Sequence, residues 1–135
     1  MGQPKREPAS TEIVVPDGCG NSPRAAWLLD FNLAFIGGEV EKALDFVAED
    51  ITWDLVGEGT IEGREGMRAW LEAMFGKRAR RVEFEYFITH SRTAAVNGSY
   101  EMESGSGFRF CDVYEFRGAA SDSPISNYTS YVIRI

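Results

Sequence analysis

Residues 108–116 have the sequence FRFCDVYEF, in which aromatic side chains recur at every second or fourth position. Successive side chains of a β-strand point to opposite faces, so a strand here places the aromatic residues on one face together with Asp112. The opposite face carries Arg109, Cys111, Val113 and Glu115. An isolated buried charge is too costly, so Asp112 is expected to be paired, neutral or next to a cavity. Asp112 is therefore the strongest candidate functional residue.

Strand patterns also precede and follow this segment. They cover residues 82–90, 93–103 and 125–135, the central strand covers 107–116, and the turns between the strands fall at 91–92, 104–106 and 118–124. Consecutive strands joined by short turns predict an antiparallel meander. Upstream, apolar periodicity predicts helices over residues 24–36, 39–48 and 64–76, and strands over 51–56 and 60–62. Ser22 and Pro23 predict the start of the first helix. This order predicts an α+β domain with helices on one face of a curved sheet.

Composition limits the classes of function. A chain of 135 residues predicts one domain, over residues 22–135, after a tail over 1–21 that is partly extended or disordered. The net charge of -7 argues against nucleic-acid or anionic-membrane partners. No apolar run approaches the ~18 residues of a membrane helix, and no signal peptide is visible, so the expected location is cytoplasmic. Cys19 and Cys111 are expected to be free thiols. A single histidine argues against a metal site, and no cofactor is expected.

Five short segments carry a family resemblance in their order and spacing: residues 37–39, 48–53, 61–65, 112–116 and 130–132. Together they resemble the nuclear transport factor 2-like superfamily, and within it the polyketide-cyclase-like (SnoaL-like) branch that includes ketosteroid isomerases. The resemblance implies a cone-shaped, curved, mostly antiparallel β-sheet with three helices on its concave face, the cystatin-like fold. It also implies an apolar pocket and often a homodimer through the outer sheet face. It implies no single activity, because the superfamily includes isomerases, cyclases, hydrolases, dehydratases and non-enzymatic adaptors.

Ketosteroid isomerases use a tyrosine on the first helix, a carboxylate base on the first strand and a protonated aspartic acid on the penultimate strand. The corresponding positions here are Phe31, Leu55 and Asp112, so the resemblance retains only the acid. Asp54 is an alternative base, although alternation places it on the opposite face from Leu55. The Arg-x-Asp pattern of limonene-epoxide-hydrolase-like members is absent near residues 98–101.

Each candidate has a structural alternative. Asp112 is either a pocket acid with a raised pKa or a structural residue bonded to Tyr114, Tyr128 or a backbone amide. His90, the single histidine, is either a general base or a solvated turn residue. Cys111 is either a nucleophile or a small residue in the core or at an interface.

Apolar candidates for ligand contacts also have the alternative role of filling the core. They are Trp27, Phe31, Trp53, Leu55, Phe110, Tyr114 and Val132. Asn97 and Tyr100 lie on opposite strand faces, so at most one of them reaches a pocket. The basic segment 77–81 either offsets the dipole of the preceding helix or binds anions.

Two main functions remain open on the sequence, beside a third option of polyanion binding through Arg78, Arg80 and Arg81. The first is binding of a small hydrophobic molecule, with acid/base chemistry of the isomerase, cyclase or hydrolase type on a carbonyl-type substrate, carried by Asp112. The second is a non-catalytic ligand-binding or dimerising adaptor domain. A homodimer is the expected assembly in both.

Overall fold

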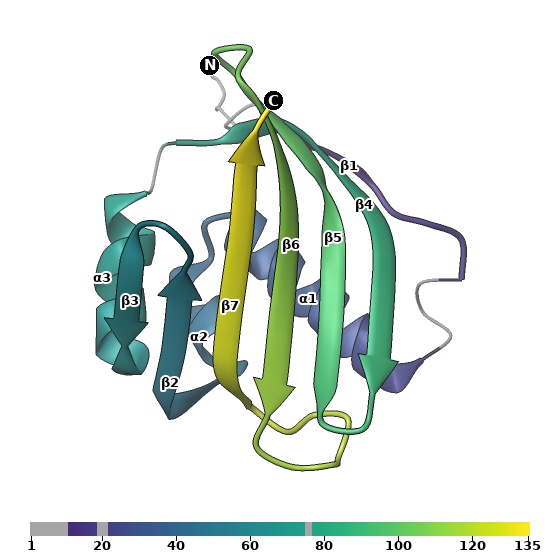
Figure 1. The fold of residues 1–135 in the computed structure, drawn as a ribbon, viewed down its shortest axis with the longest axis vertical. Helices are drawn as coiled ribbons and strands as arrows, with labels where there is room; N and C mark the ends of the chain where they lie inside the picture. Colours follow the sequence, from purple (N-terminus) through teal and green to yellow (C-terminus); the bar gives the residue numbers. More distant parts are fainter. Residues whose placement is uncertain (1–10, 19–21, 75–76) are drawn as a thin grey trace, which may run out of the picture.

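A computed structural model describes residues 11–18, 22–74 and 77–135. Ten elements follow in order: β1 (Glu12–Val14), α1 (Pro23–Ile36), α2 (Val40–Leu44), β2 (Val47–Leu55), β3 (Gly59–Glu62), α3 (Gly63–Ala73), β4 (Ala79–His90), β5 (Thr93–Met102), β6 (Gly107–Phe116) and β7 (Ile125–Arg134). The strands form one sheet in the order β1-β4-β5-β6-β7-β2-β3, with α1 lying across its concave side (Figure 1). The α+β prediction is confirmed. Within the described ranges, no helix is long and apolar enough to cross a membrane.

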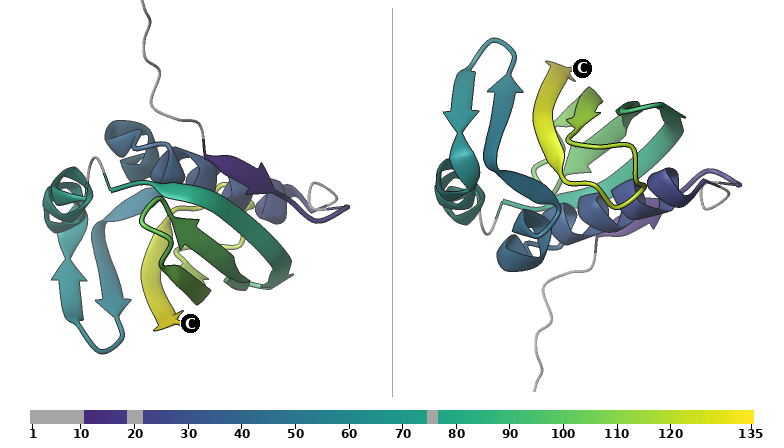
Figure 2. Two further views of the ribbon diagram at one scale, coloured as in Figure 1. Left: turned by 90° about the horizontal axis from the view of Figure 1, so that it is seen from above. Right: turned by 90° about the horizontal axis from the view of Figure 1, so that it is seen from below.

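The predicted meander is present as β4 to β7, in which every neighbouring pair is antiparallel. Two parallel pairings extend it: β7 with β2, and β1 with β4. Seen from its ends, the sheet curls, and the β2–β3 hairpin and α3 form a side wall of the resulting cup (Figure 2). The curl brings residues that are distant in the sequence around one interior.

A register shift between Phe84 and Tyr86 marks a bulge in β4, opposite Gly98 of β5. Bulges bend a strand and increase its twist. A Cβ atom at position 98 would lie 2.1 Å from the carbonyl oxygen of Glu83, so glycine is required for this close approach. The bulge therefore contributes to the curvature of the cup.

Helix α1 supplies much of the core. The Ser22 hydroxyl accepts a hydrogen bond from the Ala25 amide at 3.3 Å, and Pro23 occupies the first turn, as predicted. Leu28 and Phe31 are fully buried against the sheet. The alternation predicted for β6 is also confirmed, because its inner-face residues Phe110, Asp112, Tyr114 and Phe116 are all buried.

The predicted second helix, 39–48, is wrong at its C-terminal end. Helix α2 ends at Leu44, and Val47 and Ala48 already belong to β2. Val47 is fully buried and pairs with Ile125 of β7, so a partner almost eighty residues away overrides the helical spacing. Of the predicted tail, the structure describes only 11–18, including the strand β1. Residues 1–10 and 19–21, with Cys19, and residues 75–76 at the end of the third predicted helix lie outside the described residues.

Candidate functional site

A cavity of about 360 Å³ lies between the concave face of the sheet and helices α1, α2 and α3. Its wall is largely apolar and aromatic; it includes Phe35, Trp53, Leu55, Trp70, Phe84, Phe108, Phe110 and Val132. Four polar residues that line it are themselves buried: Asn32, Asp112, Tyr128 and Ser130. Three charged residues that line it are exposed or half-buried: Glu39, Lys77 and Arg78. The cavity therefore has a polar inner end, an apolar body and a charged mouth.

Asp112 is 7% exposed at the inner end. The Tyr128 hydroxyl donates a hydrogen bond to Asp112 Oδ2 at 3.3 Å, and Ser130 forms a second side-chain hydrogen bond with the carboxyl group. Burial raises the pKa of Asp112 from 3.8 to about 7, and this effect outweighs the two hydrogen bonds, which lower it. At neutral pH, Asp112 is therefore divided between its neutral and its ionised form.

Aromatic stacking fixes the partners of Asp112. The Tyr128 ring stacks on Trp53 at 5.1 Å and on Tyr114 at 4.9 Å. The Trp53 ring nitrogen donates to Ser130 Oγ at 3.0 Å. Burial raises the pKa of both Tyr114 and Tyr128, so both phenols stay neutral and available as hydrogen-bond donors.

Asn32 is a buried polar residue that the sequence analysis did not select. Its side-chain amide donates to the Leu28 carbonyl oxygen at 2.9 Å and to the Tyr114 hydroxyl at 3.3 Å. Asn32 also lines the cavity. A signal was present in the sequence, because Asp30 and Asn32 are the two polar residues in the otherwise apolar stretch 25–36 of α1.

The predicted ligand contacts divide into two groups. Four of them line the cavity beside Asp112: Trp53, Leu55, Phe110 and Val132. The other three lie outside its lining. Phe31 and Tyr114 are fully buried in the core, and Trp27 packs against Phe46 and Phe116 at ring distances of 4.7 and 6.0 Å.

Two other candidate bases lie away from the cavity. His90 is exposed at the end of β4, in the β4–β5 hairpin, whereas the cavity contacts β4 at Ala79, Val82 and Phe84 near its other end. Asp54 is exposed and pairs with Thr129 on the outer face of the sheet, the face that alternation predicted. The structure therefore does not bring either residue to Asp112.

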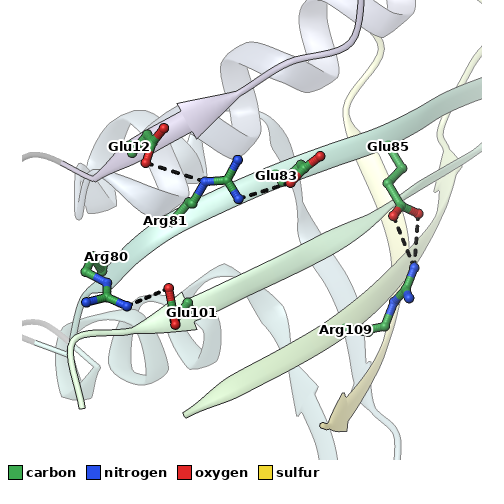
Figure 3. A network of polar contacts seen from close by, with 7 residues as sticks. All are labelled: Glu12, Arg80, Arg81, Glu83, Glu85, Glu101 and Arg109. Atoms are coloured by element: carbon green, nitrogen blue, oxygen red, sulfur yellow. Dashed lines mark hydrogen bonds and ion pairs between the residues drawn. The ribbon is translucent and has the colours of Figure 1, made fainter. Parts of the chain in front are cut away.

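The remaining polar candidates also separate by face. Tyr100 lines the cavity, whereas Asn97 lies on the outer face and donates to Glu85 Oε1 at 3.0 Å. Cys111 is half-buried on the outer face, and burial and the nearby Asp112 both raise the pKa of its thiol, which disfavours the reactive thiolate. Arg109, on the same face, pairs with Glu85 at 3.1 Å (Figure 3).

No group of three His, Cys, Asp or Glu side chains is placed to hold a metal ion in the part of the chain that the structure describes. The chemistry that the site offers is that of one buried carboxyl group. It can donate a hydrogen bond when neutral, accept one when ionised, and exchange a proton near neutral pH.

The SnoaL-like domain model matches residues 28–120. The chain belongs to the SnoaL-like domain family. The match extends from α1 to the loop after β6 and so includes Asp112. A comparison with curated proteins finds no match in sequence for this SnoaL-like domain.

Solved structures share the fold at low sequence identity. An NTF-2 like protein of unknown function from Burkholderia xenovorans superposes with a TM-score of 0.69 at 18% identity, over 85% of this chain and 86% of the other. The epoxide hydrolase/cyclase-like enzyme SalBIII, described in pyran ring formation in salinomycin, superposes with a TM-score of 0.69 at 16% identity, over 82% of this chain and 90% of the other. A putative ketosteroid isomerase from Kribbella flavida superposes with a TM-score of 0.68 at 14% identity, over 84% of this chain and 79% of the other. At these identities the likeness establishes the fold of the SnoaL-like domain alone.

Proposed function

We propose that the chain binds a small apolar or aromatic molecule that carries a carbonyl-type oxygen, and that neutral Asp112 donates a hydrogen bond to this oxygen. The observation that carries the proposal is the buried carboxyl group at the polar end of an otherwise apolar cavity. Its volume of about 360 Å³ falls within the range typical of ligand sites. Tyr128 and Ser130 occupy Asp112 as donors, so the acid proton needs an acceptor that a ligand would supply.

A more far-reaching form of this proposal is that Asp112 also carries out acid/base catalysis on the ligand. A pKa of about 7 lets Asp112 both give and take a proton at neutral pH, which suits isomerase- or cyclase-type chemistry. The proteins with similar structures include a cyclase-like enzyme and a putative isomerase. The adaptor alternative is favoured by Leu55, which lines the cavity without supplying a second carboxyl group, and by Phe31, which carries no hydroxyl and lies outside the lining. Any proton transfer would therefore be carried by the Asp112 carboxyl group, to which the neutral Tyr128 hydroxyl donates a hydrogen bond.

β-Tetralone, a bicyclic ketone, tests binding, with the hydrocarbon tetralin as the matched ligand that lacks the oxygen. The wild type should bind the ketone about fivefold more tightly than tetralin below about pH 6, because one neutral hydrogen bond is worth about 1 kcal/mol. The preference should disappear above about pH 8, where the carboxylate repels the ketone oxygen. Calorimetric titration at both pH values measures this.

Two variants separate binding from chemistry. Asp112→Asn keeps a donor that does not titrate, so it should prefer the ketone at both pH values. Asp112→Leu should bind both compounds equally. If Asp112 transfers protons, the wild type should accelerate deuterium exchange at the α-carbon of β-tetralone, measured by NMR, and Asp112→Asn should not. Ketone binding without accelerated exchange would support the adaptor reading, and equal binding of both compounds by the wild type would refute the hydrogen bond.

We further propose a homodimer formed through the outer face of the sheet. Five large apolar side chains on β4, β6 and β7 are exposed on this face: Tyr86, Ile88, Val113, Tyr131 and Ile133. Exposed apolar clusters of this kind mark interaction surfaces. Ion pairs such as Arg109–Glu85 lie next to the apolar cluster and would orient a second copy (Figure 3).

Tyr131→Arg should convert the dimer to a monomer, because it places a charge within the exposed apolar cluster. Tyr131 is 47% exposed and pairs with Cys111 at the middle of the sheet. Val56→Arg is the matched control, since Val56 is 46% exposed but lies in the β2–β3 turn. Light scattering coupled to size-exclusion chromatography measures the mass. A monomeric wild type, or dissociation by both variants, would count against this interface.

A further inference from the structure

The mouth of the cavity carries two cations, Lys77 and Arg78, from the segment between α3 and β4. The next two arginines are already neutralised: Arg80 pairs with Glu101 at 2.7 Å, and Arg81 pairs with Glu83 at 3.1 Å (Figure 3). Among the residues that the structure describes, no ion pair joins Lys77 or Arg78 to a carboxylate. In a chain of net charge -7, two cations at a cavity mouth that pair with no carboxylate within residues 11–18, 22–74 and 77–135 call for an explanation.

Both cations also line a second, open hollow of about 410 Å³ beside the mouth. The two hollows share Met102 and Phe108, so the apolar wall of the cavity continues outward beneath Lys77 and Arg78. The outer hollow adds Ser104 and Ser106; the Ser104 hydroxyl donates to Ser106 Oγ at 3.4 Å, so the hydroxyl of Ser106 is the donor offered to a ligand. Hydroxyl and cationic donors around one opening form a suitable setting for an oxyanion.

Two carboxylates partly offset the positive charge of Lys77 and Arg78. Glu39 lines the cavity at the α1–α2 turn, and Glu103 lines the outer hollow. Both hollows contain Lys77 and Arg78, whereas each contains only one of these carboxylates at its rim. The positive charge is therefore concentrated where the two hollows join.

We propose that the ligand of this site is amphipathic: an apolar body fills the cavity, and an anionic group at its outer end lies between Lys77 and Arg78. This inference rests on the proposed function and adds the second polar end of the molecule. A ligand of this kind has an acceptor oxygen near Asp112, at the inner end of the cavity, and a carboxylate, sulfonate or phosphate at the mouth. The apolar section between them spans the aromatic wall formed by residues such as Trp53 and Phe110.

A purely structural role for the two cations is the competing explanation. Helix α3 ends at Ala73, and the carbonyl groups at a helix C-terminus attract positive charge. Such a role would affect the stability of α3 but would not distinguish between ligands. A comparison of two ligands on one protein therefore separates the two explanations.

The test compares β-tetralone with β-tetralone that carries a carboxylate on its aromatic ring, at the end remote from the ketone. At low salt the wild type should bind the carboxylate about fivefold more tightly, in keeping with the modest worth of solvent-exposed ion pairs. The gain should fall as salt is added, because exposed charges are screened. The double variant Lys77→Gln/Arg78→Gln should lose this gain, measured as the ratio of the affinities of the two compounds for the same protein.

Two control variants make the result specific. Arg80→Gln removes one positive charge two residues further along the chain, where Arg80 faces Glu101, and should keep the gain in full. Glu39→Gln removes negative charge from the mouth and should increase the gain about twofold. A carboxylate that adds nothing in the wild type, or a gain that survives in the double variant, overturns the anion subsite. Failure of both compounds to bind the wild type instead overturns the proposed function itself.

Discussion

Replacing Asp112 with asparagine should remove a pH dependence of about 3 kcal/mol from the free energy of unfolding between about pH 5 and about pH 8. The folded protein holds this proton up to a pKa of about 7, whereas the unfolded chain releases it near 3.8. Below the lower value both states are protonated, and Asp112 has no effect. As the pH rises from the lower value to the higher one, only the unfolded state loses the proton, so stability falls, and above about pH 7 the penalty is constant.

Asparagine is the suitable replacement because it accepts from Tyr128 and Ser130 as the acid does but does not titrate in this range. The quantity to measure is the wild-type free energy of unfolding minus that of Asp112→Asn, from urea titrations at several pH values. This difference cancels the titration of all other groups. A difference that stays constant from pH 5 to pH 8 would show that Asp112 has an ordinary pKa, and Asp112→Asn would then have no advantage at high pH.

Replacing Phe31 with alanine should destabilise the fold by about 4 kcal/mol, the usual cost of removing a fully buried phenylalanine. Phe31 lies in the core between α1 and the sheet. Its ring meets Tyr114 and Tyr128 edge to face, with ring centroids 6.2 Å and 5.8 Å apart. A void there also frees the Tyr128 ring, which holds the donor to Asp112. The variant should therefore lose the ketone preference of the site as well as stability.

Phe31→Leu is the graded control, because it keeps most of the volume and should cost about 1.5 kcal/mol. Chemical unfolding measures both losses, and binding of β-tetralone to the folded fraction measures the effect on the site. If Phe31 were instead a ligand contact with little role in packing, the alanine variant would lose affinity for tetralin and β-tetralone alike, with a loss of stability below about 1 kcal/mol.

The meander was predictable because its information is local. Alternation within each strand and the glycine and serine residues in the turns give the bounds of β6 directly, and those of β5 and β7 to within one residue. The start of β2 was not predictable in the same way. Val40, Ala43, Leu44 and Val47 satisfy a helical spacing, and only the pairing of Val47 with Ile125 decides for a strand.

The candidate site likewise combines features that the local sequence predicts with features that only long-range packing decides. Asp112 could be selected because a carboxyl group within an aromatic row requires an explanation in any strand. Depth could not be predicted: alternation shows that Tyr114 and Phe110 share a face, but only the packing of α1 decides that Phe110 lines the cavity and Tyr114 lies behind it. Ser130 was missed because its role depends on the Trp53 ring nitrogen, which lies 77 positions away in the sequence.

Strand β7 is the last described element to be synthesised, and it completes the candidate site. It lies between β6 and β2 in the sheet, and it supplies both Tyr128 and Ser130. A chain emerges from the ribosome from its N-terminus, so every other described element is made before residues 125–134. Until then Asp112 has neither of these two partners, and β6 and β2 lack the strand that pairs with both. The hydrogen-bonding environment of the acid is therefore completed only when the last described strand joins β6 and β2 in the sheet.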